Sequence, residues 1–237
     1  ARPVGTSCLI EDVAFAVEDL PEATVKLQKL IADHGYRDTC IYGHAFEGNY
    51  HFIINQLFSD ESEVQRYAAM MRDVARLVVE EYDGSLKAEH GTGRNMAPFV
   101  KYEWGEEAFA AMRELKEIFD PNYMLNPGVI FNDDPECFIK HFKPLPELKL
   151  KGMENNLAPE GDRHNSTRET IEGVRKANKC IECGFCEVNC LTCGLTLSSR
   201  QRIVIQREIS HLRETGENPK RLATLVKQYR YQGDQTC

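Results

Sequence analysis

The sequence predicts an α+β fold followed by a smaller helical segment. Short runs of apolar and β-branched residues alternate with longer stretches in which apolar residues recur at helical spacing. A glycine-containing turn at residues 47–49 joins two of the short runs and predicts an antiparallel hairpin. After a stretch rich in proline and charge at residues 144–178, a cysteine cluster opens a second region with two further helical patterns.

A strand and a helix come first. Residues 7–17 are rich in apolar and β-branched side chains, which favours a strand. Leu20 and Pro21 then begin a helix, because proline fits the first helical turn. Gly35 is the expected end of this helix, since glycine readily adopts the left-handed conformation that closes a helix.

The hairpin and two more helices complete the first region. We expect strands at 39–46 and 50–58, an amphipathic helix at 61–81, a glycine-punctuated loop at 83–96 and a helix at 106–119. The pair Asp120-Pro121 should end this last helix, because a residue before proline disfavours the helical conformation.

The second region differs in composition. Few large apolar residues occur in the stretch after residue 157, which favours a linker or extended arm. Residues 200–214 and 219–229 have helical patterns. We therefore predict a first domain over residues 1–146, a linker over 147–177 and a small helical domain over 178–237 that continues beyond the chain.

The composition excludes some classes of partner. The chain has 237 residues, 42% of them hydrophobic and 28% charged, with a formal net charge of -8. This charge gives no electrostatic reason to expect nucleic acid as a partner. No apolar run approaches the roughly 18–20 residues needed to cross a bilayer, so no transmembrane segment is expected. We expect a cytoplasmic location, with peripheral attachment to the inner face of the membrane as an alternative.

The ends of the chain and its cysteines are informative. The chain begins at Ala1 without methionine and stops at Cys237, so we expect a fragment of a longer protein. Of nine cysteines, five lie within residues 180–193. An odd, clustered set argues against a disulfide framework and favours metal ligation in a reducing compartment.

The cysteine cluster has the spacing of an iron–sulfur motif. Its four ligand candidates follow one another with gaps of two, two and three residues: Cys180, Cys183, Cys186 and Cys190. In two-cluster ferredoxins the first three such cysteines hold one 4Fe–4S cluster and the fourth serves the other. Cys237 would then belong to the second cluster, and neither cluster would be complete within a fragment ending there.

Two alternatives stay open for this motif. A structural zinc site is the competing interpretation, although zinc sites usually pair two short motifs across a longer loop. The proline expected after the fourth cysteine is replaced by Leu191, and an additional Cys193 could take the outlying ligand position instead of Cys190.

A second group of metal-ligand residues lies in the hairpin. With a two-residue turn at Glu47-Gly48, His44 and His51 would face each other directly across the two strands. Two opposed imidazoles suit a divalent metal. The loop at residues 87–93 adds Glu89 and His90, and a His–His–carboxylate set with an open position is a recurrent catalytic centre. The alternative is a pair of half-buried strand histidines and an unrelated surface loop.

Three motifs together resemble a known family. Residues 43–51 read GHAFEGNYH, residues 88–93 read AEHGTG, and residues 119–128 read FDPNYMLNPG. They resemble the C-terminal part of the FAD-linked oxidases of the vanillyl-alcohol oxidase superfamily, which includes D-lactate, D-2-hydroxyglutarate and glycolate dehydrogenases. The resemblance covers about residues 1–146 and implies an antiparallel sheet with helices on one face. The cysteine motif is similar to the ferredoxin-like domain that long members carry.

The resemblance also implies roles for single residues. It implies a metal such as zinc on His44, His51 and Glu89, and it implies that His90 accepts the substrate hydroxyl proton. The other positions carried over are Asn49, Arg2 and Thr6 for substrate and Asn126 near the flavin. Position 47 is glutamate where the family commonly has aspartate, and this difference keeps the negative charge.

The implied protein oxidises a D-2-hydroxy acid, D-lactate by default, by hydride transfer to FAD. Electrons would leave through the clusters to a quinone, a cytochrome or an electron-transfer protein. We expect FAD to be held mainly by a domain that precedes this region, so the fragment alone should be inactive. The alternatives are an electron-transfer subunit with a non-catalytic oxidase-like scaffold, and a zinc-binding structural module.

Overall fold

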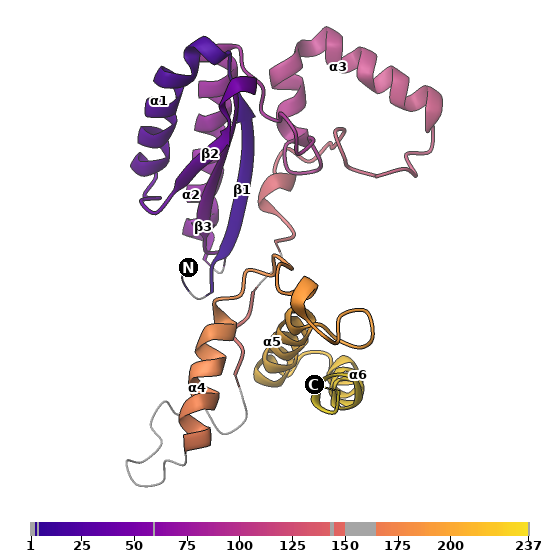
Figure 1. Ribbon diagram of the computed structural model, residues 1–237. Coiled ribbons are helices and arrows are strands. Elements are labelled where there is room, and N and C mark those ends of the chain that lie inside the picture. The colour runs from indigo at the N-terminus through magenta and orange to yellow at the C-terminus, as the bar shows by residue number, and fades with distance from the viewer. Residues whose placement is uncertain (1–2, 4, 59, 143–144, 150–164, 237) are drawn as a thin grey trace. The chain divides into compact units, whose positions relative to one another are not determined.

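The computed structural model describes residues 3, 5–58, 60–142, 145–149 and 165–236 (Figure 1). Its chain divides into two units, one of residues 8–143 and one that combines residues 1–7 with residues 144–237. Each unit is described by itself below.

The larger unit is built on a three-stranded sheet with the strand order β1-β3-β2. The strands are β1 (Ser7–Ala14), β2 (Cys40–His44) and β3 (Asn49–Gln56), and β2 pairs with β3 in antiparallel orientation. Helix α1 (Leu20–Asp33) connects β1 to β2. The strand predicted over 7–17 ends earlier, because Val17–Asp19 form a 3-10 turn that leads into α1.

Three helical stretches follow the sheet. Helix α2 (Glu61–Arg76) continues as a π-helical turn over Leu77–Glu81, and helix α3 (Val100–Phe119) follows a 3-10 turn at Ala97–Phe99. Helix α3 is kinked at Gly105, whose φ of 77° lies outside the helical region, so the part after the kink begins at the predicted residue 106 and a short helical stretch from Val100 precedes it. A further 3-10 turn spans Cys137–Ile139.

Helices α1 and α2 lie together along one side of the sheet (Figure 1). Alternate residues of β3 point to them, so that Phe52 and Ile54 are fully buried. They join the core of the larger unit, whose members also include Val13, Leu27, Ile31, Tyr67, Met70, Met71 and Val74. The predicted α+β fold, with an antiparallel sheet and helices, is confirmed. The side chains of Asp12, Asn49 and His51 point to the opposite face of the sheet, which therefore carries polar residues.

The second unit is helical. It contains α4 (Asn165–Asn178), a 3-10 turn at Glu187–Asn189, α5 (Ser199–Thr215), α6 (Pro219–Tyr229) and a π-helical turn over Arg230–Asp234. Helices α5 and α6 lie where the sequence predicts helices. Helix α4 falls in the last part of the predicted linker, where arginine, lysine and glutamate residues have a high helix propensity.

Buried polar side chains organise this unit. The side chain of Asn178 binds both backbone groups of Leu148, accepting from its N–H at 2.7 Å and donating to its carbonyl at 3.1 Å. Arg207 of α5 is buried and donates to the carbonyl oxygens of Ala177, Asn178 and Cys180. These bonds attach the beginning of the cysteine motif to α5. No helix in the described ranges is both long and apolar enough to cross a membrane.

Candidate metal centre

The hairpin brings the two predicted histidines to one face in a register that differs from the prediction. His44 pairs with Asn49, and His51 pairs with Tyr42. The predicted direct pairing of His44 with His51 is therefore wrong by two residues. The reason is the turn: Ala45–Glu47 form a 3-10 turn closed by Gly48, which replaces the expected two-residue turn.

A shift of two residues preserves the face on which a side chain lies, because strand side chains alternate with period two. His44 and His51 are diagonal neighbours, with ring centroids 5.7 Å apart and ring planes at 89°. The two imidazoles therefore still lie on one face of the hairpin, as the sequence predicts.

Gly48 fixes the tip of this hairpin against the end of β1. Its φ is +69°, and its carbonyl oxygen accepts a hydrogen bond from the N–H of Phe15 at 2.9 Å. A Cβ atom at position 48 would overlap the Phe15 carbonyl oxygen. Glycine is therefore required both for its backbone conformation and for the close approach of the two segments.

Glu89 joins the two histidines. Its Oε1 atom lies 2.8 Å from Nε2 of His51 and 3.3 Å from Nε2 of His44. One ligand atom from each of the three residues lies within 4.8 Å of the others. His51 is 4% exposed, whereas the side chains of His44 and Glu89 are about half exposed. Two imidazoles and one carboxylate thus converge at a position that solvent can reach from one side.

His90 lies beside this group. Its ring stacks on that of His51, with centroids 4.7 Å apart and planes at 11°. Its Nε2 atom is 3.8 Å from Oε1 of Glu89, and its side chain is partly exposed. His90 also forms a second possible ligand group with Asp12 and His51, which shares His51 with the first.

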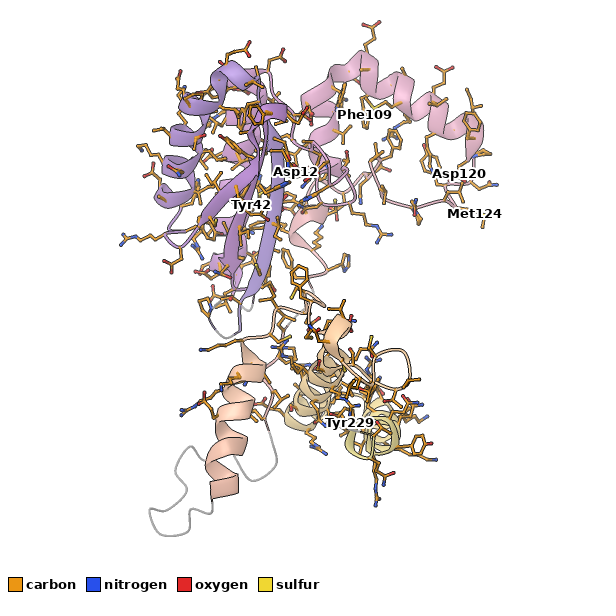
Figure 2. All side chains as sticks on the ribbon, viewed as in Figure 1. Asp12, Tyr42, Phe109, Asp120, Met124 and Tyr229 are labelled. Atoms are coloured by element: carbon orange, nitrogen blue, oxygen red, sulfur yellow. The ribbon has the colours of Figure 1, made fainter. Side chains whose placement is uncertain are left out.

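Asp12 lies on β1 (Figure 2) and contacts the loop that carries Glu89 and His90. Its Oδ2 atom accepts three backbone hydrogen bonds, from the N–H groups of Ala88 at 2.9 Å, Glu89 at 2.8 Å and His90 at 2.9 Å. Burial alone would raise the pKa of Asp12, but these amides and the side chain of Asn49 outweigh it and hold the pKa below its ordinary value. Asp12 is therefore a carboxylate that fixes the loop.

Asn49 has a different environment from the one implied by its predicted contact with substrate. It is buried, and its Nδ2 atom donates to Oδ1 of Asp12 and to the carbonyl oxygen of Val13. Its Oδ1 atom is buried without a hydrogen-bond partner in the described part of the chain. The contacts of Asn49 are thus with β1, and its substrate role stays a prediction.

Comparison with known proteins shows which family the part of the chain that carries these residues belongs to. Residues 1–130, more than half of the chain, match the family described as "FAD linked oxidases, C-terminal domain". The chain belongs to this family. All three histidines of the cluster and both acidic residues beside them lie within the matched range of the oxidase domain.

Several curated relatives resemble this oxidase domain. A D-2-hydroxyglutarate dehydrogenase of Xanthomonas citri pv. viticola is 32% identical over 125 residues, which are 51% of this chain and 26% of the relative. A D-lactate dehydrogenase of Anaerostipes hadrus is 29% identical over 119 residues, 50% of this chain and 25% of the relative. The glycolate oxidase subunit GlcD of Bacillus subtilis (strain 168) is 27% identical over 126 residues, 53% of this chain and 26% of the relative. The chain spans about a quarter of the length of these relatives.

The predicted flavin-proximal residue lies in a turn that is tied to the histidine loop of the oxidase domain. Asn126 is exposed and adopts a φ of 46°. The turn after it is held by two contacts: Arg94 donates to the carbonyl oxygen of Pro127 at 3.1 and 3.0 Å, and Ile130 donates to that of Gly93 at 3.0 Å. The second and third family motifs are thereby fastened together.

The two remaining substrate predictions cannot be placed beside the oxidase-domain histidines. Arg2 lies outside the described residues. Thr6 belongs to the other unit, where its hydroxyl donates to the carbonyl oxygen of Pro3 at 2.7 Å. Both roles stay predictions.

The predicted iron–sulfur ligands lie in irregular backbone. Cys183, Cys186 and Cys193 are exposed, while Cys180 and Cys190 are partly buried. The hydrogen bond between Cys190 and the Thr192 side chain is the main cause that lowers the pKa of Cys190 to about 7. In the described ranges only the two histidine-containing groups bring three ligand atoms together, so the cysteines are not gathered here. Cys237 lies outside the described residues.

Sequence reasoning missed Asp12 and its neighbour Glu11. Glu11 forms a buried ion pair with Lys87 at 2.8 Å, so β1 holds both the beginning and the middle of the histidine loop. A signal was present, because two adjacent acidic residues within an apolar strand must each find a partner when buried. The identity of those partners is not encoded locally, since the loop lies more than 70 residues further along the chain.

Proposed function

We propose that this chain is part of an FAD-linked oxidoreductase that oxidises a D-2-hydroxy acid, with D-lactate as the favoured substrate. The observation that carries the proposal is the convergence of His44, His51 and Glu89, with His90 stacked beside them, in a domain of the FAD-linked oxidase family. D-lactate and D-2-hydroxyglutarate dehydrogenases among the relatives support this substrate class.

The histidine cluster fits a divalent metal such as zinc. His44, His51 and Glu89 would hold it, since two neutral imidazoles and a carboxylate form a common catalytic donor set that leaves one position open. The fit is supported by His51, whose buried Nδ1 faces Asp12, so that its Nε2 is directed to the cluster. When bound, such a metal supplies Lewis-acid chemistry that lowers the pKa of a coordinated hydroxyl group.

His90 is the residue that accepts the hydroxyl proton in this proposal. Its partly exposed ring is reachable by a substrate, and its backbone is fixed through Asp12. Stacking on His51 sets the orientation of the ring. The reference pKa of the amino acid histidine is about 6.5, so this type of side chain suits proton transfer close to neutral pH. The hydride would pass to FAD, and the turn at Asn126 would lie near the flavin.

We further propose that electrons leave through 4Fe–4S clusters to a quinone, a cytochrome or an electron-transfer protein. The spacing of Cys180, Cys183, Cys186 and Cys190 supports this, with Cys237 as a ligand of the second cluster. Thiolates suit iron–sulfur ligation, and the low pKa of Cys190 favours its ionised form.

The test is a substrate screen with the full-length protein and an artificial electron acceptor. We expect turnover of D-lactate or another D-2-hydroxy acid, and we expect His90→Ala to reduce kcat by about 10²–10⁴-fold, the usual contribution of a general base, without loss of bound metal. His211→Ala is the matched control, because His211 lies in α5 outside the oxidase domain. Unchanged turnover in His90→Ala would favour a non-catalytic oxidase-like scaffold.

A further inference from the structure

We propose that Asp12 is the positioning residue of the histidine cluster: it sets the tautomer of His51 and fixes the backbone that carries Glu89 and His90. The inference rests on the proposed metal centre and deepens it. Asp12 itself would touch neither the metal nor the substrate. Its two carboxylate oxygens act on different parts of the site.

One oxygen fixes the loop. Oδ2 accepts the N–H groups of three consecutive residues, Ala88, Glu89 and His90. Three amides that point to one anion hold the backbone of the loop in a single conformation, and charge-assisted bonds of this kind are stronger than neutral ones. The Cα atoms of the predicted ligand Glu89 and of the predicted base His90 are therefore placed by a strand residue.

The other oxygen faces His51. Oδ1 lies 3.5 Å from Nδ1 of His51, and both side chains are almost fully buried. Apart from this carboxylate, Nδ1 has no hydrogen-bond partner among the described residues. A proton on Nδ1 would face the Asp12 carboxylate and leave the lone pair of Nε2 for a metal, whereas in the metal-free site a proton on Nε2 would face Glu89 at 2.8 Å. Histidines that bind metals are commonly oriented by such a carboxylate.

The hydrogen bonds of Asp12 also separate its role from that of a ligand. Asp12, His51 and His90 form a possible metal group of their own. However, Oδ2 is already saturated by three amides, and Oδ1 accepts the amide of Asn49. A metal on Asp12 would have to break bonds that hold the loop, whereas the carboxylate of Glu89 has one oxygen directed at two histidines. The geometry thus assigns Glu89 as the ligand and Asp12 as the group that orients.

The first measurement is made on the wild-type chain loaded with Zn²⁺. With ¹⁵N-labelled histidine, the chemical shifts of the two ring nitrogens of His51 report which one carries the proton and which one binds the metal, and a separate His51→Gln sample identifies the signals. At neutral pH we expect the proton on Nδ1. A proton found on Nε2 instead would overturn the inference.

The second measurement compares metal affinity. Asp12→Asn keeps the size of the side chain but replaces one acceptor oxygen with an N–H donor, so it opposes either the loop amides or Nδ1 of His51. We expect the affinity for Zn²⁺ and Co²⁺, titrated on the whole chain, to fall by about 10–100-fold, which is typical of a lost outer-shell partner.

A matched control separates this effect from general destabilisation. Asp120 is another poorly exposed carboxylate that accepts two backbone N–H groups, those of Met124 and Leu125, but it lies at the end of α3 (Figure 2). Asp120→Asn should lose stability and leave Zn²⁺ affinity unchanged. Equal Zn²⁺ affinity in Asp12→Asn and wild type would refute the role of Asp12. Absence of Zn²⁺ binding by the wild-type chain would instead refute the proposed metal centre.

Discussion

The histidine cluster and the cysteine segment at residues 180–193 both carry metal-ligand side chains, but the fold supports them to different degrees. His51 is 4% exposed and is held by strand pairing, by the ring of His90 and by Asp12. In the cysteine segment, three of the five cysteines are exposed. The apolar side chains between the cysteines are exposed as well, with Phe185 at 82% and Leu191 at 94%.

The two regions differ in what holds their metal-ligand side chains in place. The histidine ligands are placed by a sheet, a buried carboxylate and a helix-backed core, so their geometry exists without a metal. The cysteine ligands lie in turns without a regular ladder, and ligation itself would have to supply much of their order. The histidine cluster is preorganised by the fold, whereas the proposed cysteine site would depend on its cofactor.

The largest expected difference between the two regions is in stability. Phe52→Ala removes a fully buried ring from the core and should lower the free energy of unfolding of the larger unit by about 3–5 kcal/mol. Phe185→Ala removes an exposed ring and should change the free energy of unfolding of its own, helical unit by no more than about 0.5 kcal/mol. Urea unfolding of the metal-free chain measures both, and equal effects would contradict the comparison.

The next expected effect concerns metal content. His51→Ala should weaken Zn²⁺ binding by more than about 100-fold, because loss of a ligand should exceed the loss of an outer-shell partner. It should leave iron uptake by the cysteines unchanged. Cys183→Ala in the full-length protein should reduce iron uptake by the cysteines and leave Zn²⁺ binding unchanged. Elemental analysis and visible absorption after anaerobic reconstitution distinguish the sites, and a variant that empties both would show that they are coupled.

The smallest expected effect concerns one thiol. Cys190 has a pKa of about 7, chiefly because of its hydrogen bond with the Thr192 side chain. Below that pH the thiol becomes protonated and less reactive, and above it the thiolate dominates. Thr192→Val should raise the pKa toward the ordinary value, so that alkylation of Cys190 at pH 7 slows several-fold. Mass spectrometry of iodoacetamide-treated, metal-free chain across pH 6–9 measures this, and an unchanged pH midpoint would exclude Thr192 as the cause.

Periodicity in the sequence was sufficient to predict α1, α2, α5, α6, the second part of α3 and the hairpin, because each has a local pattern, but it missed α4, which lies in the predicted linker. It also predicted that His44 and His51 share a face, since parity survives an even shift in register. The register itself was wrong, because the 3-10 turn at Ala45–Glu47 depends on Gly48 binding Phe15, a contact from outside the hairpin.

Long-range contacts limited the prediction of the site. Asp12 binds a loop that is distant in the sequence, so no local pattern could reveal that one carboxylate fixes Glu89 and His90. Asn49 was assigned to substrate by resemblance, but its amide donates to Asp12. The cysteine motif is recognised by spacing alone, and spacing does not determine where the sulfur atoms lie before a cofactor binds.

The tip of the hairpin has a consequence for engineering the surface beside the histidine cluster. Position 48 is closed to every other amino acid, because any side chain would collide with Phe15 and shift both histidines with the strand ends. Two residues earlier, the side chain of Phe46 is 96% exposed, so replacing it should disturb little packing in the described part of the chain. Libraries that keep Gly48 and randomise Phe46 would alter the surface next to the histidines while leaving their spacing intact.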